Sequence, residues 1–133
     1  MRLWHIDLIP YLPNSQLVAQ WRELNSIFKK QDKHILINYI YNYDKDYLYI
    51  YSLNVIDEME HRNFVIRSYE NFNNYFNEIF NKPIPRHLRF DEHNKEYLTI
   101  CYYNLKEKYL RHQKDFTKQN FQKLTEFYFT STK

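Results

Sequence analysis

The chain has 133 residues, 44% of them hydrophobic, and a formal net charge of +3, which suits a single domain with one core. It has no glycine, which excludes the glycine-rich phosphate loops of nucleotide-binding proteins, and its single cysteine, Cys101, excludes an internal disulfide. The sequence shows neither a signal-peptide pattern nor an apolar run long enough to span a membrane. We therefore expect one domain over residues 1–133 in a reducing cytoplasm, without a membrane partner or a cofactor.

The first predicted helix follows a turn between Pro10 and Pro13. Asn14 or Ser15 can cap this helix, which should run to about Lys30. Apolar residues recur at spacings of three and four and predict its buried face: Leu17, Trp21, Leu24 and Phe28. At about 100° per residue, one flank of that face holds Arg22, Ser26, Lys29 and Lys33, and the other holds Gln16, Gln20 and Glu23.

Two patterns compete in the tyrosine-rich middle of the chain. Tyrosines alternate with Ile, Leu and Asn on both sides of residues 44–46, which is typical of a β-hairpin. From Tyr47 onward, apolar residues also fit one helical face: Leu48, Tyr51, Val55, Ile56 and Met59. The residues alone leave open both the hairpin and a helix from about Tyr47 to Arg62.

Three amphipathic segments follow. Residues 70–80 carry aromatic and apolar side chains at helical spacing, and Pro83 and Pro85 stop that segment. A longer helix is predicted from about Asn94 to Arg111, and a short last one around Leu124. The residues expected to share the core are Trp21, Leu24, Phe28, Ile56, Leu98, Cys101 and Leu105.

The chemistry-bearing residues are few. The six histidines show no metal-ligand spacing and have no companion cysteines, so we predict no metal site. No serine lies in a glycine-flanked turn of the kind that hydrolases use for their nucleophile. The remaining group of interest is the N-terminal amine together with Arg2, Arg22 and Glu23.

The N-terminus itself is a candidate nucleophile. Arg2 is too large for the pocket of methionine aminopeptidases, so we expect the mature chain to begin with Met1. Near neutral pH a free α-amine is unprotonated to a greater extent than a lysine. An amine, one carboxylate for proton transfer and guanidinium groups for phosphate suit an attack on a sugar carbon in nucleic acid. The alternative interpretation is an ordinary amphipathic helix whose Arg22 and Glu23 are simply solvated.

A family resemblance bears on this choice. The start MRLW, a P-Y-L turn, the stretch LVAQWREL and DKHI some ten residues later resemble the pyrimidine-dimer DNA glycosylases of the endonuclease V type. The stretch NKEYLTICYYNLKEKY resembles uncharacterised bacterial relatives that also begin with MRLW. The resemblance implies an all-α fold of three main packed helices plus short extra ones, with the N-terminus inserted between helices. It thereby favours the helix from about Tyr47 to Arg62.

The resemblance also implies a reaction. In the family, the α-amine attacks the deoxyribose C1′ of a damaged nucleotide, expels the base and holds the sugar as an imine, after which β-elimination cuts the strand. By position, Met1 would supply the amine and Glu23 would stabilise the cationic sugar and assist proton transfers. The DNA-binding residues would be Arg2, Arg22, Lys29, Lys30, Lys33 and His34. The expected partner is double-stranded DNA with a damaged base or an abasic site, bound by a monomer at the nucleoid without metal or cofactor.

The sequence departs from the phage enzyme of this family at several places. Met1 stands where the phage enzyme exposes a small residue, and Ser26 replaces a basic residue, with Lys29 and Lys30 close enough to substitute for it. Ser15 and Gln16 occupy the position of a polar pair that contacts DNA. A second hypothesis is therefore a catalytically silent module of the same fold that binds nucleic acid or protein.

Overall fold

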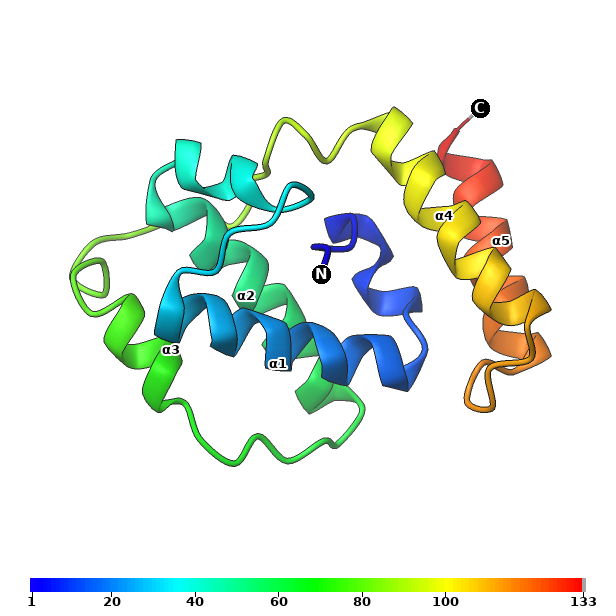
Figure 1. Cartoon of the computed structure of the whole chain (residues 1–133), viewed down its shortest axis with the longest axis horizontal. Coiled ribbons are helices and arrows are strands. Elements are labelled where there is room, and N and C mark those ends of the chain that lie inside the picture. Colours follow the sequence, from blue (N-terminus) through cyan, green and yellow to red (C-terminus); the bar gives the residue numbers. More distant parts are fainter. Residues whose placement is uncertain (133) are drawn as a thin grey trace.

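The computed structural model describes residues 1–132, and all of its regular structure there is helical (Figure 1). The predicted all-α fold is therefore confirmed. Two short 3₁₀ helices accompany five α-helices: η1 (Ile6–Tyr11), α1 (Asn14–Lys30), η2 (Asn38–Asn42), α2 (Lys45–His61), α3 (Glu70–Tyr75), α4 (Lys95–Leu110) and α5 (Lys118–Ser131). Helix α1 packs on α2 and α3, α4 pairs with α5, and η1 contacts both α2 and α5. Helix η1 thus lies between two groups of helices, one formed by α1, α2 and α3 and the other by α4 and α5.

Helix α1 has the predicted bounds but not the predicted cap. Pro13 is its N-cap residue and makes no side-chain capping bond. Instead, the carboxylate of Asp115, from the loop between α4 and α5, accepts hydrogen bonds from the backbone N–H and hydroxyl of Ser15, both at 2.6 Å. Partial burial acts to raise the pKa of Asp115, but the bonds from Ser15 and Gln113 hold it below its usual range. A carboxylate that is far away in the sequence therefore caps the N-terminus of α1, in place of a local side chain.

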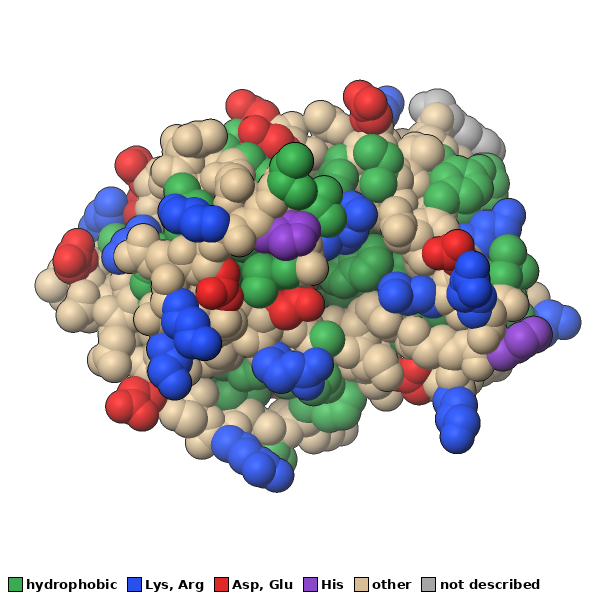
Figure 2. Space-filling view, viewed as in Figure 1, with side chains coloured by type: hydrophobic (Ala, Val, Ile, Leu, Met, Phe, Trp, Pro, Cys, Tyr) green, Lys and Arg blue, Asp and Glu red, His purple; other side chains and the backbone are tan. Residues whose placement is uncertain are grey.

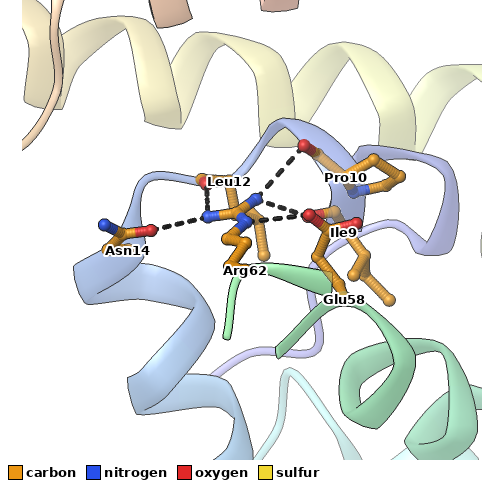
Figure 3. Close-up of polar contacts among 6 residues, drawn as sticks. All are labelled: Ile9, Pro10, Leu12, Asn14, Glu58 and Arg62. Carbon is orange, nitrogen blue, oxygen red and sulfur yellow. Dashed lines mark hydrogen bonds and ion pairs between the residues drawn. The ribbon is translucent and has the colours of Figure 1, made fainter. Parts of the chain in front are cut away.

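Arg62 holds the turn that precedes α1 (Figure 3). Its guanidinium donates to the carbonyl oxygens of Leu12 (2.7 Å) and Pro10 (3.1 Å) and to Oδ1 of Asn14 (2.9 Å). Its Nε forms an ion pair with Glu58, one turn earlier in α2, at 2.8 Å. Charge-assisted bonds of this kind are stronger than neutral ones, so Arg62 stabilises the turn that joins η1 to α1.

The ambiguous middle of the chain is helical, and the hairpin alternative is wrong. Residues 45–61 form α2, which begins two residues before the expected start at Tyr47. All five residues of the proposed helical face are buried: Leu48, Tyr51, Val55, Ile56 and Met59. Ile50 and Ser52 are buried as well, because α1 and η1 both pack against α2. Burial on more than one side explains why apolar residues alternate as they do in a strand.

Two other expectations need correction. The segment over residues 70–80 is helical only as far as Tyr75, and its asparagines, which have low helix propensity, fit the early end. Trp21 is only partly buried, with its ring 6.2–6.5 Å from those of Phe28, Tyr69 and Phe72. The other expected core residues are buried: Leu24, Phe28, Ile56, Leu98, Cys101 and Leu105.

Candidate active site

The N-terminal segment before η1 has no regular secondary structure and is held by side chains. The side-chain amide of Gln20, in α1, bonds to both sides of Leu3: its Nε2 donates to the carbonyl of Arg2 at 3.1 Å, and its Oε1 accepts from the N–H of Trp4 at 2.9 Å. The Tyr51 hydroxyl, from α2, lies 2.7 Å from the Trp4 carbonyl and 2.8 Å from Oε1 of Gln20. Gln20 and Tyr51 are both buried, so α1 and α2 together fix the segment.

A second set of contacts reaches the same segment from α4 and the residues before it. The hydroxyl of Tyr97 donates to the carbonyl of Leu3. Nδ1 of His93 accepts from the N–H of Ile6 at 3.0 Å, so its Nε2 carries the proton and faces the Tyr39 hydroxyl at 2.7 Å. Burial lowers the pKa of His93 to about 3, and His93 is therefore neutral at physiological pH. The N-terminus is thus inserted between helices, as the resemblance implied.

Glu23 lies one turn beyond Gln20 and is held by it. Nε2 of Gln20 is 3.3 Å from a carboxylate oxygen of Glu23. Partial burial raises the pKa of Glu23, and the charges of the α-amine and Arg22 and a backbone hydrogen bond from Arg2 oppose this shift. The amine is therefore near enough to act on the carboxylate, although the two form no ion pair within residues 1–132. One amide side chain thus positions both the N-terminal backbone and the carboxylate.

Arg2 lies at the edge of this site. Its guanidinium carbon is 5.8 Å from the ring centres of both Trp4 and Tyr97, a distance at which a cation is attracted to aromatic faces. Cys101 is completely buried, and burial raises the pKa of its thiol. It is therefore a core residue and not a reactive thiol. Arg2 is only partly buried, which leaves part of its guanidinium facing solvent.

The remaining expected DNA-binding residues follow α1 and the turn after it. Arg22 is exposed beside Glu23, and Lys29 and Lys30 are exposed at the last turn of α1. Lys33 places its ammonium 3.5 Å from the ring centre of Tyr41, and Nδ1 of the exposed His34 accepts from the N–H of Leu36 at 3.1 Å. Lys and Arg side chains are spread over this face, with acidic ones between them (Figure 2). The structure therefore brings the α-amine of Met1 and the Arg2 backbone close to Glu23. Arg22 instead lines a surface hollow with Val18 and Phe64, and the other basic residues lie farther along the chain.

The positions that depart from the phage enzyme have local partners. Ser15 is bonded to Asp115, and Gln16 exchanges side-chain hydrogen bonds of 2.8 and 3.0 Å with Gln113. The hydroxyl of Ser26 donates to the carboxylate of Asp32. A surface hollow between η1, α2 and α5 is lined by neither Met1 nor Glu23. The candidate site is therefore described by its polar network.

Sequence reasoning missed the residues that build this network: Gln20, Tyr39, Tyr51, His93 and Tyr97. Helical spacing places Gln20 on a polar flank of α1, whereas the structure buries it completely. One available signal was its position one turn before Glu23 on the same flank. The other contacts join residues 47 to 94 positions apart, and no local pattern predicts them.

Loss of the Gln20 amide should destabilise the protein measurably. In Gln20→Met the buried N–H of Trp4 and the partly buried carbonyl of Arg2 would lose their partner, and a buried group left unpaired costs about 1–3 kcal/mol. We expect the free energy of unfolding, measured by urea denaturation, to fall by about 2–4 kcal/mol. The exposed Gln122→Met in α5 is the matched control, and an equal stability of the two variants would contradict the role given to Gln20.

The comparison with known families agrees with this geometry. Residues 1–71, more than half of the chain, match the family model of pyrimidine dimer DNA glycosylase. The protein belongs to this family. No curated protein and no solved structure matches the chain. Among the helices of residues 1–132, none is long and apolar enough to cross a membrane.

Proposed function

We propose that the protein is a DNA repair glycosylase with AP-lyase activity that acts on damaged double-stranded DNA, pyrimidine dimers included, through an imine on the α-amine of Met1. The observation that carries the proposal is the Gln20 amide, which holds the Arg2 backbone and the Glu23 carboxylate beside the amine. Membership of the pyrimidine dimer glycosylase family supports it. Incubation of the untagged protein with ultraviolet-damaged and abasic duplexes tests it, and failure to cut either duplex would contradict it.

The proposed chemistry begins with the lone pair of the Met1 nitrogen, which forms a bond to the deoxyribose C1′. The bond from C1′ to the damaged base breaks, and the base leaves with the electron pair and a proton. The C1′–O4′ bond then opens to give the imine, and O4′ takes the second proton of the amine. Glu23 is the group in reach for these transfers, and its negative charge stabilises the cationic sugar.

Strand cleavage follows once the imine nitrogen has taken up a proton from water. Loss of a proton from C2′ places electrons beside C3′, and the 3′ phosphate leaves with its bonding pair, which is a β-elimination. Water then hydrolyses the imine and restores the amine. We assign the proton transfers to Glu23, whose raised pKa makes it a better base than an ordinary glutamate. These steps use only the amine, the carboxylate and water.

The proposed DNA contacts come from the basic residues near the site. Arg2 and Arg22 would hold the phosphates that flank the lesion, since a guanidinium binds phosphate through two parallel hydrogen bonds. The exposed basic residues farther along would contact phosphates beyond them: Lys29, Lys30, Lys33 and His34. Because His34 uses Nδ1 within its own turn, Nε2 is the atom left to donate to DNA. One monomer supplies all of these groups.

Binding to DNA should weaken as salt rises. If these cations contact phosphates, the logarithm of the binding constant should fall with log salt by about 0.9 per phosphate neutralised. Arg22→Ala should flatten that slope by about one unit, as measured by fluorescence anisotropy with an abasic duplex. Arg67→Ala is the control, since Arg67 is an exposed arginine outside the helices. A native slope near zero would argue for a protein partner.

A further inference from the structure

The turn after α1 presents apolar side chains to solvent. Ile35 is 85% exposed and Leu36 is 41% exposed, whereas the next residue, Ile37, is completely buried and anchors the turn in the core. In Figure 1 the turn projects beyond α1 toward the part of the view that contains the N-terminus. The hydrogen bonds agree with that placement, since the hydroxyl of Tyr39 in η2 bonds to His93, which itself accepts from the N–H of Ile6.

The turn is also internally braced. The N–H of His34 donates to the side chain of Asn38 at 2.7 Å, and the N–H of Leu36 donates to Nδ1 of His34 at 3.1 Å. The carbonyl of His34 accepts from the N–H groups of Ile37 and Asn38, both at 2.9 Å. Four hydrogen bonds within five residues therefore fix the backbone that carries Ile35 and Leu36.

The surroundings of this apolar tip are cationic. Lys29, Lys30 and Lys33 precede it, all exposed, and none of them forms an ion pair within residues 1–132. The acidic residue among them, Asp32, accepts a hydrogen bond from Ser26. A rigid apolar tip that follows cations without ion pairs is complementary to a duplex, whose phosphates lie outside and whose base stack lies within.

We propose that Ile35 and Leu36 form a wedge that enters the base stack of duplex DNA beside the lesion and opens it for the candidate site. Aliphatic side chains inserted between base steps unstack and kink a duplex in this way. The lysines would hold the adjoining phosphates while the wedge takes up the space that opens. The proposal rests on the proposed function for its substrate, damaged duplex DNA.

The test uses a double variant, Ile35→Ser with Leu36→Ser. Both side chains are exposed, so the substitutions should leave stability almost unchanged. The untagged proteins are mixed with a duplex that carries 2-aminopurine opposite a pyrimidine dimer, because the fluorescence of this base analogue rises when it unstacks. We expect the native protein to raise the fluorescence and the double variant to lose most of that rise. Leu110→Ser, an exposed leucine at the end of α4, should behave as the native protein does.

A cleavage assay separates the wedge from a general defect. The double variant should cut the dimer duplex at least about tenfold more slowly, which corresponds to about 1.4 kcal/mol, yet cut a single-stranded abasic oligonucleotide at the native rate. Equal losses on both substrates, or no loss on either, would overturn the wedge. If the native protein cuts neither substrate, the proposed function fails. The fluorescence of the native protein and of the double variant then decides alone whether Ile35 and Leu36 act as a wedge. A native protein that binds the duplex without a fluorescence rise also overturns it.

Discussion

A two-residue extension in front of Met1 should abolish strand cleavage. Two extended residues displace the α-amine by up to about 7 Å, and the new terminus no longer lies beside Glu23. Loss of a covalent nucleophile should lower the cleavage rate on an abasic duplex by roughly a thousandfold or more. Gel assays of strand cleavage measure this effect.

The same two residues placed after Lys133 are the matched control, and that protein should cut at the native rate. Affinity for the abasic duplex should fall much less than the rate, because Arg22 and the lysines of α1 are unaffected. Native cleavage by the N-terminally extended protein would exclude Met1 as the nucleophile and leave a lysine as the candidate.

Replacement of Glu23 by Gln should separate binding from chemistry. The amide keeps the shape of the side chain and can still accept the hydrogen bond from Gln20, but it cannot take a proton or stabilise a cationic sugar. We expect cleavage to slow by about 10²–10⁴-fold, the usual contribution of a general acid or base. Glu126→Gln, at an exposed position of α5, should leave cleavage unchanged. A Glu23→Gln enzyme of native rate would remove Glu23 from the mechanism.

The raised pKa of Glu23 has consequences for rate and for stability. Cleavage should fall on the acid side at a higher pH than an ordinary glutamate would produce, because partial burial raises the pKa of this carboxyl. A carboxyl whose pKa is raised on folding favours the folded state below its unfolded pKa, and this contribution is lost as pH rises through the folded value. At pH 7 the ionised Glu23 thus lowers the free energy of unfolding. Glu23→Gln should therefore melt at the native temperature or above it.

Helices α4 and α1 are the ones that the sequence specified best. Helix α4 was predicted from about Asn94, and Asn94 is its N-cap, with Oδ1 2.9 Å from the N–H of Tyr97. Helix α1 lies within one residue of its predicted bounds, although a residue 100 positions away, Asp115, caps it. Apolar spacing therefore located α1 even where the capping chemistry was misassigned.

Helix α2 shows where local pattern is insufficient. Its apolar residues lie on more than one side because α1 and η1 both pack against it, and a helix buried in this way loses the single apolar stripe that identifies it. The family resemblance, and not the periodicity, favoured the helix there. The segment after Tyr75 shows the converse, because helical spacing continues there without a helix.

The candidate site was only partly accessible from the sequence. Met1, Arg2, Arg22 and Glu23 could be proposed from residue chemistry and resemblance, because they lie at the terminus and on one helix. The groups that hold them come from four separate segments, and their hydrogen bonds depend on the folded chain. The neutral state of His93 likewise follows from burial, which a sequence of six scattered histidines does not reveal.

Trapping of the intermediate tests the central claim most directly. The untagged protein is incubated with an abasic duplex in borohydride, which reduces an imine to a stable amine, and the protein is then digested and analysed by mass spectrometry. The account predicts a single adduct on the peptide that begins with Met1, bonded through its α-amine. An adduct on a lysine side chain, or active cleavage with no adduct at all, would contradict it.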